Sequence, residues 1–121
     1  MEIPNNADAA QADAGTGTKL KLITCVVQRG RADKLVKAAI AAGANAATVF
    51  FARGMGIRER LGLLGLAIVP EKEVILIVCR DALVQTLLDT LTKAGGLDVP
   101  GHGVAYVTSI ERAVGLLPAA S

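Results

Sequence analysis

The stretch EKEVILIVCRDALVQTLLDTLTKAGG, residues 71–96, decides the fold because it contains two different hydrophobic periods. Residues 74–79 are apolar at every position, which is typical of a short strand with both faces buried. Leucines then recur at the spacing of one helix face: Leu83, Leu87, Leu88 and Leu91. The Gly95–Gly96 pair ends this pattern. The sequence therefore predicts a strand over residues 71–79, followed by a helix.

The same alternation of strand and helix precedes this stretch. KLKLITCVVQ, residues 19–28, is rich in β-branched and apolar side chains and predicts a strand. A turn leads into a helix predicted over residues 32–42, which Gly43 ends. The apolar stripe of this helix is Leu35, Val36, Ala39 and Ile40. NAATVFFAR, residues 45–53, predicts a second strand.

VAYVTS, residues 104–109, predicts a fourth strand, and residues 110–117 form a short terminal piece. The order β-α-β-β-α-β predicts a ferredoxin-like α+β fold, in which two helices cover one face of an antiparallel four-stranded sheet. We expect a domain over residues 19–117. Residues 1–18 lack sustained periodicity and predict a disordered tail, and residues 118–121 a C-terminal tail.

The strands are apolar on both faces. In the first strand, Leu22 and Val26 point one way, and Ile23, Cys25 and Val27 point the other. A sheet covered by helices on one face only should alternate apolar with polar residues. Something must therefore cover the second face, and other copies of the chain are the expected cover.

Residues 53–70 form a loop that is longer than compact domains usually contain, which suggests a functional segment. Gly54 and Gly56 lie at its base. Three arginines surround these glycines: Arg53, Arg58 and Arg60. Residues 61–69 carry no charge and are mostly apolar. The loop is therefore expected to meet an anion at its base and a protein at its tip.

Composition excludes several classes. A net charge of +2 with 2% aromatic residues argues against nucleic-acid binding. Cys25 and Cys79 lie in apolar runs and are expected to be buried free thiols, typical of a cytoplasmic protein. We find no secretory signal, no transmembrane run, no metal-ligand spacing and no nucleophile–base pair in the sequence. The expectation is a cytoplasmic protein that is not an enzyme.

Three segments resemble the PII signal-transduction family. QRGRADKLVKAAIAAGANAATVFFARGMG, residues 28–56, is similar to its first loop, first helix and second strand, and residues 79–95 to its second helix. DVPGHGVAYVTSIERAVG, residues 98–115, resembles its B-loop and last strand. The resemblance covers about residues 19–117. It implies a homotrimer with inward-facing sheets, adenine nucleotides in the clefts between subunits, and a T-loop, here residues 53–70, that contacts a target protein.

The resemblance also implies a set of nucleotide-binding residues. Contacts from the second strand correspond to Ala46, Ala47 and Thr48, and the residue that packs on adenine corresponds to Val78. Glycines that admit phosphate oxygens correspond to Gly54, Gly56, Gly101 and Gly103. Cations and donors complete the set: Arg58, Arg60, His102 and Arg112.

The departures from the family concern charge and modification. Val104 replaces a usual lysine, and Gly115 and Leu117 replace two arginines. ADP, AMP and a cyclic nucleotide therefore stay open beside ATP, with Arg58 and Arg60 replacing part of the lost charge. The only tyrosine, Tyr106, lies in a strand, so tyrosine modification of the T-loop is not expected.

These features predict a divergent PII-like regulator that controls a target, with a membrane transporter favoured by analogy. No cofactor is required; an adenine nucleotide is the expected effector, with bicarbonate as a further possibility. Two alternatives stay open. One is a carboxysome-type protein that senses bicarbonate. The other is a trimer related to the metal-binding CutA architecture, against which the single His102 and the buried cysteines argue.

Overall fold

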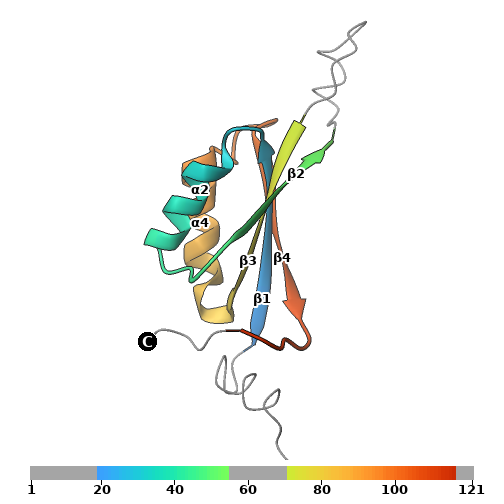
Figure 1. Cartoon of the computed structure of the whole chain (residues 1–121). Helices are drawn as coiled ribbons and strands as arrows, with labels where there is room; N and C mark the ends of the chain where they lie inside the picture. The colour runs from blue at the N-terminus through green and yellow to red at the C-terminus, as the bar shows by residue number, and fades with distance from the viewer. Residues whose placement is uncertain (1–18, 55–70, 117–121) are drawn as a thin grey trace, which may run out of the picture.

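The sheet has the predicted antiparallel order. The computed structural model describes residues 19–54 and 71–116. Its elements are β1 (Leu20–Gln28), α2 (Ala32–Ala41), β2 (Thr48–Arg53), β3 (Glu71–Arg80), the 3₁₀ turn η1 (Asp81–Leu83), α4 (Val84–Gly95) and β4 (Gly103–Ile110). The strands pair in the order β2-β3-β1-β4, and every pair is antiparallel. Both helices lie on one face, and the other face is bare (Figure 1). The ferredoxin-like α+β fold is confirmed.

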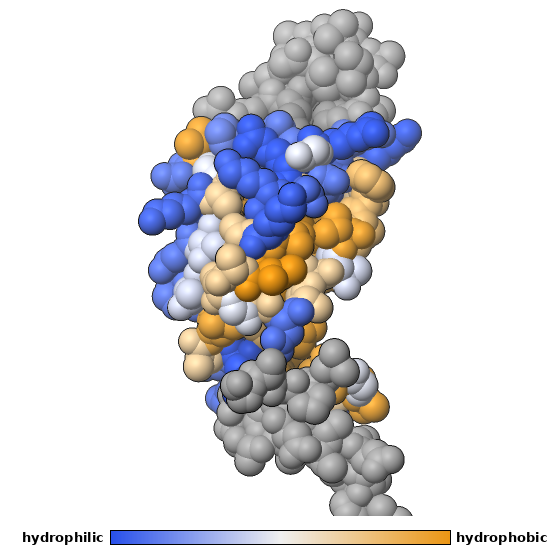
Figure 2. Space-filling model, turned by 60° about the vertical axis from the view of Figure 1, so that its left-hand side comes forward, coloured by the Kyte–Doolittle hydropathy of each residue, from blue (hydrophilic) through white to orange (hydrophobic). Residues whose placement is uncertain are grey.

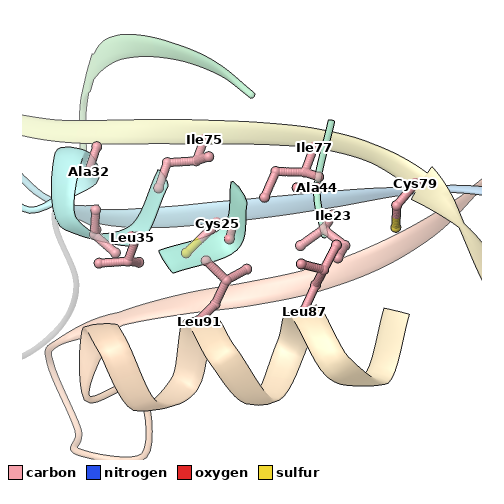
Figure 3. Packing of buried hydrophobic residues seen from close by; sticks show 12 residues of the cluster. Ile23, Cys25, Ala32, Leu35, Ala44, Ile75, Ile77, Cys79, Leu87 and Leu91 are labelled. Carbon is pink, nitrogen blue, oxygen red and sulfur yellow. The ribbon is translucent and has the colours of Figure 1, made fainter. Parts of the chain in front are cut away.

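The core lies between the sheet and the helices. Ile23 and Ile77, on neighbouring strands, are fully buried, as are Leu35 of α2 and Leu87 and Leu91 of α4. Their side chains point toward one another across this layer (Figure 3). Burial of one such side chain contributes about 1.5–3 kcal/mol. The predicted orientation of β1 is confirmed, because its core-facing positions are the ones that the helices cover.

Several predicted boundaries shift. β2 begins at Thr48 rather than at Asn45, because the chain first turns to bury Ala44, which is 5% exposed. β3 continues to Arg80, and the second helix starts with the η1 turn. β4 extends over Gly103–Ile110, so it is longer than predicted.

The predicted stripe of the first helix is partly wrong. Leu35 and Ala39 are buried, but Ile40 is 49% exposed. One residue along a helix turns the side chain by 100°. With Ala39 facing the sheet, the next position turns away from it.

A carboxylate from β3 holds the N-terminus of α2. Arg31 occupies the N-cap position and makes no side-chain capping bond. Glu73 Oε1 instead accepts hydrogen bonds from the backbone N–H groups of Gly30, at 2.8 Å, and Ala32, at 2.9 Å. A carboxylate at this end of a helix is favourable because the first N–H groups lack partners within the helix. The contact connects α2 to the first part of β3, one of the two inner strands.

The bare face of the sheet is apolar, as predicted. Leu22 and Val26 of β1 lie on it, and Phe50, Val104 and Tyr106 are 46%, 51% and 50% exposed. The described chain therefore contains no element that covers this face. Predictions for residues 1–18, 55–70 and 117–121 fall outside the described residues.

Candidate functional site

A cavity of about 620 Å³ lies at the end of the sheet where β1 begins and β3 ends. The segment that connects α2 to β2 forms one wall. The end of β3 and the η1 turn form another, and Gly115 and Leu116, which follow β4, complete the lining. Its lining residues are Leu20, Gly43, Ala44, Asn45, Ala46, Ala47, Thr48, Leu76, Val78, Cys79, Arg80, Ala82, Leu83, Gly115 and Leu116.

Unequal strand lengths create this cavity. The ladder between β2 and β3 starts at Thr48, which lies opposite Leu76. β3 continues beyond this point to Arg80, with no strand beside it on that edge. Residues 45–47 diverge from β3 instead of pairing with it, and the space between them is the cavity.

The backbone of Val78 points into this space. The N–H of Asp81 donates to the carbonyl of Lys19 at 2.9 Å, so odd-numbered residues of β3 hydrogen-bond toward β1. Successive residues of a strand point their N–H and C=O groups to opposite edges. Val78 therefore directs both groups toward the β2 side, where the ladder has ended. One donor and one acceptor on the same residue suit the edge of a heterocycle.

The cavity wall is mostly apolar. Its uncharged polar side chains are the hydroxyl of Thr48 and the amide of Asn45. Burial, and secondarily the Asp81 carboxylate, raise the pKa of the Cys79 thiol. This thiol is therefore neutral at pH 7 and adds no negative charge. Arg80 supplies the only charge among the lining residues that the structure describes.

The structure brings four predicted site residues together. Ala46, Ala47, Thr48 and Val78 all line this cavity. Their shared position is consistent with a common ligand. Nucleotide binding by these residues stays a prediction.

Four other predicted residues lie at the opposite end of the sheet. Gly101, His102 and Gly103 lead into β4, and Gly54 follows β2. β2 has 6 residues, so roughly 20 Å separates the two ends. Hydrophilic side chains crowd the end where β2 stops and β3 starts (Figure 2). A single copy of the chain therefore does not unite the predicted residues in one site.

Gly103 has a structural role that is independent of any ligand. Its φ is +145°, and a Cβ at this position would lie 2.5 Å from the carbonyl oxygen of Val26. Only glycine lets β4 start this close to β1. Its neighbour His102 packs against Gly96, and the buried His102 Nδ1 has no hydrogen-bond partner in the described structure.

The remaining predicted site residues lie outside the main cavity or outside the described residues. Arg112 lines a smaller cavity of about 280 Å³, and Leu20 borders both this cavity and the larger one. Gly56, Arg58 and Arg60 lie outside the described residues. The sequence interpretation missed Asn45 and Arg80 as cavity residues. The sequence did contain a signal for Arg80, because this charged residue directly follows the apolar run of residues 74–79. We interpreted it as leading into the second helix.

The described residues contain no disulfide, no cluster of metal-ligating side chains and no transmembrane helix. Cys25 and Cys79 are buried and unpaired, as predicted. No group of three or more His, Cys, Asp or Glu side chains converges within residues 19–54 and 71–116. Neither α2 nor α4, the α-helices of that part of the chain, has the length and hydrophobicity of a transmembrane span.

The family of the chain follows from its sequence. The sequence profile described as nitrogen regulatory protein P-II matches residues 20–118, so the chain belongs to this family. Proteins of this family are regulators rather than enzymes. No curated protein matches this chain.

The fold is also that of a solved plant protein. The crystal structure of Arabidopsis thaliana PII bound to citrate is similar, with a TM-score of 0.61 and 19% sequence identity. The match covers 77% of this chain and 78% of that one. At this identity the similarity shows the fold.

Proposed function

We propose that this chain is a non-catalytic PII-like regulator that binds an adenine nucleotide and controls a target protein. The observation that carries the proposal is the cavity beside Val78. It combines apolar walls with a free backbone donor and acceptor and the hydroxyl of Thr48. Adenine offers the matching surfaces, an apolar ring face and an edge with an acceptor beside a donor.

The same proposal places the ligand between subunits. Gly101 and Gly103 lie at the end of the sheet opposite the cavity, so they reach a ligand there only from another copy. The bare apolar face of the sheet supports a homotrimer, because association of copies would remove it from water. In such an assembly the cavity of one subunit meets the B-loop glycines of the next.

Control of the target follows from the T-loop. Residues 53–70 join β2 to β3, and nucleotide binding changes the preferred state of this loop. Such a switch requires a coupling free energy of about 1–3 kcal/mol between ligand and loop. We place the protein in the cytoplasm and propose a membrane transporter as the target of the apolar segment, residues 61–69.

Isothermal titration calorimetry with AMP, ADP, ATP and cyclic AMP tests the nucleotide proposal. Wild-type protein should bind at least one of them, and Ala46→Glu should abolish this binding by placing a carboxylate on the cavity wall. Ala41→Glu is the matched control, because Ala41 is exposed at the end of α2. Absence of binding at millimolar concentration, or equal effects of both variants, would contradict the proposal.

A small anion such as bicarbonate is the second candidate effector. The observation that favours it is the plant PII structure, which was solved with citrate. A bicarbonate titration of the nucleotide-free protein separates the candidates. Binding of bicarbonate without binding of any nucleotide would select the second.

A further inference from the structure

Arg80 is the charged residue of the cavity lining. The other described lining residues, Gly115 and Leu116 among them, are uncharged. The Cys79 thiol stays protonated because burial raises its pKa. The Asp81 carboxylate acts on the same thiol, so it offsets part of the positive potential that the Arg80 guanidinium creates in the cavity.

The Arg80 guanidinium is available to a ligand. Within the described chain the ion pairs are Arg29 with Glu71 and Lys37 with Asp33, and neither involves Arg80. No hydrogen bond joins its side chain to the described residues either. All five N–H donors of this guanidinium are therefore open to an anion.

Arg80 lies close to Val78, whose backbone faces the cavity. Val78 and Arg80 are separated by one residue of β3, so their side chains lie on the same face, about 7 Å apart. Arg80 is therefore close enough to a heterocycle at the backbone of Val78 to reach the group attached to that heterocycle. In a nucleotide the groups that follow the base are the sugar and the first phosphate.

We propose that Arg80 binds the phosphate closest to the sugar of the nucleotide. This inference rests on the proposed function and names the cation that it needs. Guanidinium and phosphate form two parallel charge-assisted hydrogen bonds, which a lysine cannot reproduce. Because AMP, ADP and ATP share this phosphate, the contribution of Arg80 is the same for all three, whereas adenosine gains nothing from it.

Calorimetry on the full chain tests the inference with Arg80→Gln, Arg80→Lys and the control Lys37→Gln. Lys37 carries the same charge, but its side chain is 78% exposed on α2, away from both ends of the sheet. Arg80→Gln should weaken AMP, ADP and ATP by the same factor, roughly tenfold, which corresponds to about 1.4 kcal/mol. Arg80→Lys should recover part of this loss. Arg80→Gln should leave adenosine binding unchanged, and Lys37→Gln should leave nucleotide binding unchanged.

The outcomes separate this inference from the proposed function. If wild-type protein binds nucleotides and Arg80→Gln binds them equally well, the inference is wrong and the proposed function stands. An equal loss of adenosine affinity in Arg80→Gln would also overturn it, because the residue would then act on the shape of the cavity. If the wild type binds neither nucleotides nor adenosine, the proposed function itself fails.

Discussion

Cys25 makes the stability of the fold depend on pH at the scale of a single residue. Its thiol is fully buried, and burial raises its pKa from 9.0 to about 11. Between these values the unfolded chain loses the thiol proton while the folded chain keeps it. The folded state then binds more protons, so the free energy of unfolding falls as pH rises, by up to about 1.4 kcal/mol per pH unit. Below pH 9 this contribution is constant.

Denaturant unfolding of the wild type and of Cys25→Ala measures this effect. Other groups titrate in both proteins, including the buried Cys79, so the difference between the two isolates Cys25. From pH 9 to about 11, the wild type should lose more stability than the variant. Parallel curves would show that the buried thiol is not responsible.

Glu73 links two elements, because a side chain of β3 completes the N-terminus of α2. Replacing it with alanine removes the acceptor for the N–H groups of Gly30 and Ala32. Loss of such a cap costs about 1 kcal/mol. The melting temperature of Glu73→Ala should therefore fall by about 4–8 °C, as followed by circular dichroism.

Glu71→Ala is the matched control for this prediction. Glu71 belongs to the same strand, but its side chain is 48% exposed and pairs with Arg29, which is 63% exposed. Exposed ion pairs contribute little, so this variant should melt close to the wild type. An equal fall in melting temperature in the two variants would mean that the capping contact stabilises the fold no more than the exposed ion pair does.

At the scale of the whole molecule, the bare sheet face bears on the oligomeric state. Tyr106 lies on this face, about halfway along the edge strand β4, and is 50% exposed. In the proposed trimer, Tyr106→Glu places a charge in the interface, and a buried unpaired charge is costly. Light scattering after size exclusion should give a trimer mass for the wild type and a smaller mass for this variant.

Ile40→Glu is the control, because Ile40 is 49% exposed on α2, on the opposite side of the sheet. It should remain trimeric. A monomeric wild type would contradict the proposed assembly, and a trimeric Tyr106→Glu would contradict the proposed interface. Circular dichroism checks that both variants keep their secondary structure.

Local patterns in the sequence were enough to predict the elements and their order. The apolar run of β3 and the leucine spacing of α4 arise from contacts with a single neighbouring layer, and both can be recognised within one segment. The two-sided apolarity of β1 likewise predicted the bare face. The grouping of residues 46–48 with Val78 came from family resemblance, and the structure agrees that they are neighbours.

Only the tertiary structure decided the extent and the charge of the candidate site. The cavity exists because Ala44 turns into the core and β2 starts late, which depends on contacts between distant segments. Arg80 becomes a cavity residue only through the extension of β3 beyond β2. The close approach of Gly103 to Val26 likewise depends on the pairing of β4 with β1. Hydrophobic periodicity reports which face of an element is buried, but not where neighbouring strands end, and the cavity lies at such an end.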